Sequence, residues 1–210
     1  MDRPIPAGFA HARSPRADGR SPEPAHSYRG SVSDRNQDPA CAVAHGDQPI
    51  APDGRRLVVV FASPVARHLL HFARHLGFET VLVDPANADG EADADTAVTD
   101  MDRAKIDATT DVVISDHHRS ELGPVLRDVL RRSPRWVGVM GSPRHVAPHV
   151  AALTELGVTR ADVDRVHRPI GLNIGSRTPP EIALATLAGL IADRTGRPGG
   201  FTFDSAPHAG

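Results

Sequence analysis

Apolar residues gather in short runs from residue 56 onward, and these runs predict the strands of a buried sheet. A continuous apolar run of this length is typical of a strand covered on both faces of a parallel sheet. A further run, around Thr96–Thr99, is weaker. The clear runs are Leu57–Phe61, Thr80–Asp84, Asp111–Ser115 and Arg135–Met140.

Between these runs the apolar residues recur with the spacing of amphipathic helices. The first helix is predicted to begin after Ser63, because a serine N-cap is followed there by a proline, and to end at Gly77. Thr178 and Glu181 have the spacing of a capping box at the start of the last helix, which we expect to be largely buried. Two more helices are predicted over 121–132 and from the segment Gly141-Ser142-Pro143 to Leu156.

Strands that alternate with helices predict an α/β fold: a doubly wound parallel sheet of Rossmann type, in a single domain over residues 56–196. Residues 1–55 carry eight prolines among polar residues and show no apolar period. We expect this stretch to be a disordered leader, which either binds a partner or is an unstructured start. Residues 197–210 are expected to form a flexible tail.

Composition and charge exclude several classes of protein and of binding site. The formal net charge of -2 gives no basic surface for nucleic acid or an anionic membrane. The single cysteine, Cys41, excludes a disulfide within one chain and a cysteine zinc site. No apolar stretch approaches the roughly 18 residues of a membrane span. No apolar segment follows Met1 either, so we expect no signal peptide and a cytoplasmic protein.

Ligands of doubly wound sheets bind beyond the carboxyl ends of the strands, where the strand order reverses. Asp84 stands at the end of the second strand, where a dinucleotide-binding fold has its ribose-binding carboxylate; the alternative is a polar strand end. Asp116 and His117 follow a buried strand and are candidates for contact with a ligand. The alternative for Asp116 is a helix cap.

Two glycine-containing loops are the better candidates for binding an anion. In the first, Gly141 allows close approach of the backbone, Ser142 offers a hydroxyl and Arg144 can pair with a phosphate; simple N-capping by Ser142 is the alternative. In the second, Gly175 suggests a tight turn and Arg177 precedes a helix with free N–H groups. The alternative there is a turn that packs the last helix on the sheet.

Three segments together resemble the C-terminal Rossmann-like domain of the xanthine dehydrogenase accessory factor family (XdhC/CoxI). They are RVHRPIGLNIGSRTPPEIA at 165–183, RWVGVMGSPR at 135–144 and the Asp-His pair at 116–117. The resemblance implies a protein that binds the molybdenum cofactor, a molybdopterin, and supports its maturation or insertion into a molybdenum hydroxylase of the xanthine or carbon monoxide dehydrogenase type. It implies a chaperone rather than an enzyme. We assign no catalytic or metal-binding residue.

The sequence departs from the family pattern at two places. Full-length members carry a further N-terminal domain with a Gly-Gly-Cys element, which residues 1–55 do not resemble, so a separate chain is a candidate source of it. The family's first turn usually reads Gly-x-Gly-His, where this chain has Phe61-Ala62-Ser63-Pro64. Side chains at 61 and 63 hinder a pyrophosphate, which makes NAD(P) binding doubtful. Two functions are alternatives to the cofactor accessory role. One is a module that binds only protein partners or its own copy as a homodimer, and the other is an NAD(P)-dependent oxidoreductase.

Overall fold

The computed structural model describes residues 43–46, 54–86, 93–142 and 146–200. The chain divides between Pro49 and Ile50 into two compact units. In the first unit, residues 43–46 form one helical turn, closed by a hydrogen bond from the Gly46 N–H to the Val43 carbonyl (3.1 Å). Cys41, most of the predicted leader and residues 201–210 lie outside the described residues, so the leader and the tail stay predictions.

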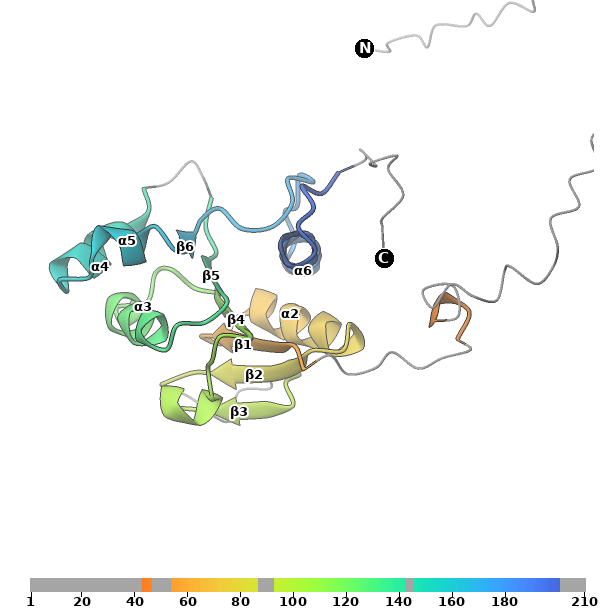
Figure 1. Ribbon diagram of the computed structural model, residues 1–210, viewed down its shortest axis with the longest axis horizontal. Coiled ribbons are helices and arrows are strands. Elements are labelled where there is room, and N and C mark those ends of the chain that lie inside the picture. The colour runs from red at the N-terminus through yellow and green to blue at the C-terminus, as the bar shows by residue number, and fades with distance from the viewer. Residues whose placement is uncertain (1–42, 47–53, 87–92, 143–145, 201–210) are drawn as a thin grey trace, which may run out of the picture. The chain divides into compact units, whose positions relative to one another are not determined.

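The second unit is built on a sheet of six parallel strands in the order β3-β2-β1-β4-β5-β6 (Figure 1). The order reverses between β1 and β4, so the predicted doubly wound fold is confirmed. All five predicted strands are present, the weak one included, whereas β6 is too short to stand out as an apolar run. The strands are β1 (Arg56–Val60), β2 (Glu79–Val83), β3 (Thr96–Val98), β4 (Thr110–Ile114), β5 (Trp136–Val139) and β6 (Val166–His167).

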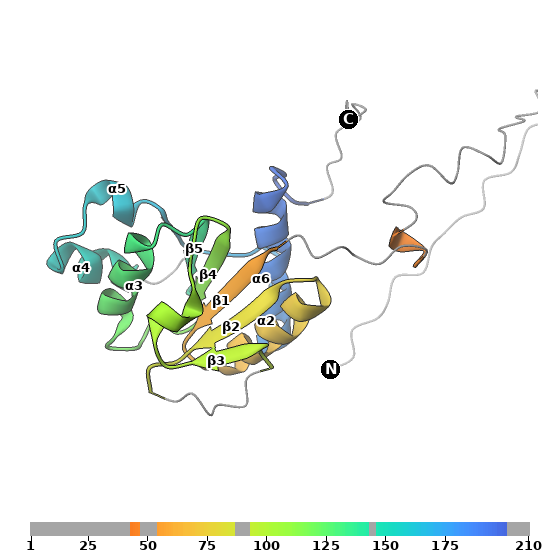
Figure 2. The same cartoon turned by 60° about the horizontal axis from the view of Figure 1, so that its bottom comes forward.

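Helices cover both faces of the sheet, as Figure 2 shows. One face is covered by α2 (Pro64–His75) and α6 (Pro179–Arg194), the other by α3 (Leu122–Arg131), α4 (Pro148–Glu155) and α5 (Arg160–Val163). The short 3-10 helix η2 (Met101–Ala104) follows β3. Along β1, Val58 packs in one core cluster and Val59 in the other, and both are fully buried. Burial on both faces explains why the strand is apolar at every position.

Proline is the first residue of α2, α4 and α6. The sequence predicted this for Pro64 and Pro179, but for the helix before Leu156 it pointed to Pro143, and that start is wrong. Residues 146–147 are not helical and α4 begins at Pro148, with Ala147 as an N-cap that makes no side-chain bond. A helix starting at residue 143 would contain Pro148 in its interior, where proline lacks an N–H and its ring clashes with the preceding turn. The predicted N-cap role of Ser142 is therefore wrong as well.

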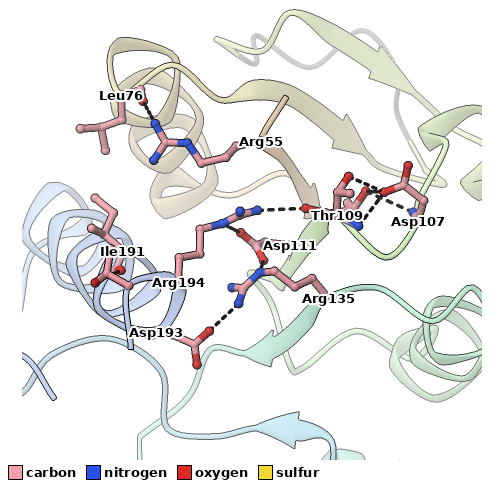
Figure 3. A network of polar contacts seen from close by, with 11 residues as sticks. Arg55, Leu76, Asp107, Thr109, Asp111, Arg135, Ile191, Asp193 and Arg194 are labelled. Carbon is pink, nitrogen blue, oxygen red and sulfur yellow. Dashed lines mark hydrogen bonds and ion pairs between the residues drawn. The ribbon is translucent and has the colours of Figure 1, made fainter. Parts of the chain in front are cut away.

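An ion-pair network ties the end of α6 to the starts of two strands (Figure 3). The fully buried Asp111 accepts from Arg135 Nε (2.5 Å) on one oxygen and from Arg194 Nε (2.6 Å) on the other. Arg135 also binds Asp193 (2.7 Å). Burial raises the pKa of the Asp111 carboxyl, and the two guanidinium groups act against that rise. Because the last turn of α6 is held at the amino ends of β4 and β5, its first turn lies toward the carboxyl ends of the strands.

Candidate functional site

The turn after β1 lies at the point where the strand order reverses. Phe61 has a φ of 71°, a left-handed conformation that favours glycine, and its side chain is fully buried. The Arg119 guanidinium lies over the ring, 4.9 Å from its centroid. The turn thus keeps the backbone shape of a glycine turn, while a phenyl ring and a guanidinium group cover the end of β1.

Asp84, at the end of β2, is only 3% exposed. One carboxylate oxygen accepts from the Ala62 N–H (2.9 Å) and the other from the Ala86 N–H (3.0 Å). Arg119 Nη2 lies 3.7 Å from the second oxygen. The carboxylate therefore holds the turn between β1 and α2 in place, which favours the structural alternative over the binding of a ribose.

Hydroxyl groups bridge β1 and β4 at the same reversal point. Ser63 caps α2 as predicted, since its oxygen accepts from the Ala66 N–H (3.0 Å). The Ser63 hydroxyl donates to Ser115 Oγ (3.0 Å), which in turn donates to the Phe61 carbonyl (2.7 Å). The polar groups of this crevice are thus bound to one another.

Asp116 and His117 lie in the loop after β4 and are half-buried. Asp116 accepts from the His118 N–H (2.9 Å), so it caps a turn of its own loop. The alternative of a helix cap is wrong, because α3 begins only at Leu122. The His117 and His118 rings are 4.1 Å apart between centroids.

Gly141 brings the end of β5 against an arginine that sequence reasoning did not single out. A Cβ at Gly141 would lie 2.5 Å from Arg168 Nη2, so the guanidinium rests directly on the glycine. Arg168 Nη2 donates to the Ser142 carbonyl (3.3 Å). Arg168 follows β6 and therefore lies at the carboxyl edge of the sheet with Gly141 and Ser142. Arg144 lies outside the described residues.

His149 in the first turn of α4 is a second residue that the sequence did not reveal. It is 4% exposed, and its Nδ1 has no hydrogen-bond partner among the described residues. Burial lowers the pKa of the imidazole, and the charge of Arg168 lowers it further. At neutral pH the ring is therefore uncharged, with one nitrogen to donate and one to accept. A buried polar atom without a partner costs about 1–3 kcal/mol, which marks this position as a candidate for ligand contact.

The start of α6 carries the other predicted anion contact. Glu181 accepts from the N–H groups of Arg177 (2.8 Å) and Thr178 (3.0 Å), which confirms the capping box. These bonds lower the pKa of Glu181. The Arg177 side chain is exposed, with no ion-pair partner in the described part of the chain. Gly175 has a φ of 72° and open space around it.

Gly171 supports the structural alternative for the same loop. A Cβ there would lie 2.9 Å from the backbone of Ala185 and Thr186, so the loop packs directly on α6. The loop thus has two parts. Gly171 packs the loop on α6, while Gly175 and Arg177 face solvent at the carboxyl edge.

Neither a metal cluster nor a membrane segment is found in the described ranges. Within residues 43–46, 54–86, 93–142 and 146–200, no three His, Cys, Asp or Glu side chains are grouped so as to hold a metal ion. The helices of these ranges are all too short or too polar to cross a bilayer.

Comparison with known proteins identifies the family of this fold. The model of the XdhC Rossmann domain matches residues 57–190, which is more than half of the chain. The chain belongs to the XdhC family. The resemblance noted in its motifs is thereby confirmed for the Rossmann domain.

Two proteins of Escherichia coli K12 and one crystal structure are among its relatives. The uncharacterized protein YqeB is 27% identical over 74% of this chain and 29% of its own length. The molybdenum cofactor insertion chaperone PaoD is 26% identical over 66% of this chain and 40% of its own length. The crystal structure is of a xanthine dehydrogenase from Bacillus halodurans, with 27% identity and a TM-score of 0.57 over 69% of this chain and 44% of that one. The chain thus matches less than half the length of each.

Proposed function

We propose that this protein is a molybdenum-cofactor accessory protein that binds the phosphate of a molybdopterin at the carboxyl edge of its sheet. The observation that carries the proposal is Arg168, which rests on Gly141 beside the buried, neutral His149. Membership of the XdhC family and the relationship to PaoD, a molybdenum cofactor insertion chaperone, support the same role.

The residues at this edge fit the phosphate of the cofactor. A guanidinium fork matches phosphate oxygens, and the absence of a Cβ at Gly141 leaves room for the guanidinium of Arg168. His149 offers a ring nitrogen that has no partner among the described residues, and Arg177 adds a second positive charge at the same edge. When bound, the cofactor supplies molybdenum redox chemistry for a recipient enzyme. The residues of this chain bind and orient it, and we propose no reaction of their own.

The recipient in this proposal is a molybdenum hydroxylase of the xanthine or carbon monoxide dehydrogenase type. The chain matches less than half the length of PaoD. Asp116 and His117, on the loop after β4, are candidates for contact with the pterin.

The proposal is tested by anaerobic incubation of the purified protein with molybdenum cofactor, followed by desalting and quantification of retained pterin by fluorescence. We expect near-stoichiometric retention. Arg168→Gln should weaken binding about tenfold, as expected for loss of one charged hydrogen bond. Arg177→Ala should have a smaller effect because its side chain is exposed. Gly141→Ala should reproduce the effect of Arg168→Gln, because the added methyl displaces the guanidinium.

Arg160→Ala is the matched control, since Arg160 is exposed on α5 and its one ion-pair partner among the described residues is Asp164. An equal loss in this control would indicate general charge attraction rather than a site. If the folded wild-type protein retains no pterin, this domain does not bind the cofactor alone, and the proposed site is wrong.

Dinucleotide binding is disfavoured by the geometry of the reversal point. Phe61 stands where the family has a glycine, and both oxygens of Asp84 are occupied by backbone N–H groups. NADH fluorescence titration checks this directly. We expect no binding in the micromolar range, and micromolar affinity would restore the oxidoreductase alternative.

A further inference from the structure

A hollow with a volume of about 370 Å³ lies between α3, the turn after α4, and α5. The helices of a doubly wound fold run antiparallel to the strands, so the C-terminal ends of α3 and α4 lie near the amino edge of the sheet. This hollow is therefore at the opposite edge from Arg168 and His149. Three arginines line it, and we call it the arginine pocket: Arg127, Arg131 and Arg165.

Two arginines of this pocket lack the carboxylate partners that half of the described arginines have. Arg127 and Arg131 are one helical turn apart on α3, and neither forms an ion pair within the described residues. The neighbouring Asp128 pairs with Arg132 instead (2.5 Å). Like charges at this spacing destabilise a helix. Eight other described arginines do have a carboxylate partner: Arg56, Arg74, Arg119, Arg132, Arg135, Arg160, Arg165 and Arg194.

A second observation concerns a single atom of Arg127. Its Nε is buried, and in the described part of the chain it has no hydrogen-bond partner. Burying a charged N–H donor without a hydrogen-bond partner lowers the stability of the fold. Native structures contain few such atoms, and a bound ligand is one reason for their retention.

The lining of the pocket indicates the chemistry of its ligand. A guanidinium group matches the oxygens of a phosphate. The pocket has three guanidinium groups and one carboxylate, that of Asp162, which lies 3.4 Å from Arg165. Leu130, Leu156 and Val158 add apolar wall. A second hollow of about 290 Å³ is also lined by Arg127 and Arg131, but there only two arginines face the carboxylate of Asp128. The larger hollow therefore has the greater positive charge.

We propose that the arginine pocket binds a small phosphorylated organic anion, with Arg127 and Arg131 binding the phosphate. The volume lies at the lower end of the range of about 300–1,000 Å³ for small-molecule sites. The site is separate from the proposed cofactor site. A ligand bound here contacts α3 and the turn after α4 and leaves the carboxyl edge free.

The proposal is tested on the full chain with inorganic pyrophosphate and glycerol 3-phosphate as probes, by calorimetry and by amide chemical shifts at fixed ionic strength. We expect saturable binding, with the largest shifts in the last turn of α3 and in residues 156–159. Arg127→Met and Arg131→Met should each weaken binding about tenfold. Arg67→Met is the matched control, because Arg67 is exposed on α2 and has no ion-pair partner among the described residues.

A stability measurement separates a ligand-binding arginine from a structural one. Methionine keeps much of the apolar stem of Arg127 but removes the buried donor and the repulsion from Arg131. We therefore expect Arg127→Met without ligand to melt at the same temperature as the wild type or higher. A lower melting temperature together with unchanged probe binding would assign the arginine a structural role and overturn the proposal.

Three other results would also overturn it. They are the absence of saturable probe binding by folded protein into the millimolar range, equal weakening in Arg67→Met, and binding of an Asp- and Glu-rich peptide by a protein that binds neither phosphate probe. The last of these would assign the pocket to a protein partner.

Discussion

Two parts of the molecule treat charge in opposite ways: the Asp111 network and the surroundings of Arg168 and His149. In the network, at the amino ends of β4 and β5, each oxygen of the buried Asp111 is bound by its own arginine, so the charges are matched within the chain. At the carboxyl edge, Arg168 rests on a bare glycine, and His149 keeps a buried nitrogen that has no partner in the described residues. Polar groups that are satisfied internally hold a fold together, whereas unsatisfied ones mark where something else binds.

The carboxyl edge is itself divided. Its centre, where the strand order reverses, is closed by the bonds that Asp84 accepts from backbone N–H groups and by the hydroxyl bond from Ser63 to Ser115. The buried His149 nitrogen that lacks a partner among the described residues lies to one side, on the helix between β5 and β6. We therefore expect a ligand of this domain to bind away from the crevice at the reversal point, which dinucleotides use in this fold.

The largest effect is expected from breaking the amino-edge network. Asp111→Ala leaves Arg135 and Arg194 without their shared partner, and removing one member of a buried ion network costs about 3–5 kcal/mol. Asp193→Ala is the control, because Asp193 is 40% exposed and surface pairs contribute about 0–1 kcal/mol. Denaturant unfolding measures both. Equal losses would mean that the network acts as a surface feature.

A smaller effect is expected from comparing two variants of Phe61. Both Phe61→Ala and Phe61→Gly lose the buried ring, but only glycine accepts the φ of 71° without strain. We expect Phe61→Gly to be about 1 kcal/mol more stable than Phe61→Ala, contrary to the usual order of these two residues. The difference in unfolding free energy measures the strain of the turn. If Phe61→Ala were instead the more stable variant, the turn would have relaxed to another backbone conformation.

His149 should make stability depend on pH. Its pKa is lowered from 6.5 in the folded state, so below that pH the unfolded chain binds more protons at this site than the folded one. The unfolding free energy should therefore fall as the pH drops below 6.5, and His149→Leu should remove that part of the slope. Denaturant unfolding curves measured between about pH 5 and 7, the range in which histidine titrates, check this. Identical slopes in the two proteins would contradict the neutral, buried histidine.

The smallest effect concerns Arg119, which contacts both Asp84 and Glu121. The hydrogen bond from Arg119 is the main cause that lowers the pKa of Glu121 to about 2. Arg119→Ala should raise that pKa toward its ordinary 4.5, as followed by carboxyl chemical shifts in a pH titration. An unchanged value would mean that Ser120 and the backbone hold the charge without the arginine.

The sequence predicted the features that depend on near neighbours. The apolar runs, the Ser63 cap and the Thr178–Glu181 capping box are local patterns, and the structure has them all. The start of α4 was mistaken, because two prolines five residues apart both suit a first helical position. Only the interior clash at Pro148 decides between them.

The strongest site residues escaped prediction for a different reason. Arg168 lies inside the family-like segment at 165–183, but its approach to Gly141 joins segments that are apart in the chain. The burial of His149 and its unpartnered nitrogen are likewise properties of the packed molecule. Residue type and spacing do not encode which polar atoms remain without a partner after folding.

The prolines that begin α2, α4 and α6 bear on how the ligand that we propose at the carboxyl edge would be held. Each lacks the amide hydrogen that a phosphate-binding helix would offer from its first residue. Each of these helix starts therefore has fewer N–H groups to offer the anion that we propose binds here, which leaves a larger share of the binding to side chains such as Arg168. In the proposed function, release of the ligand would then need side chains to rotate and no helix to move.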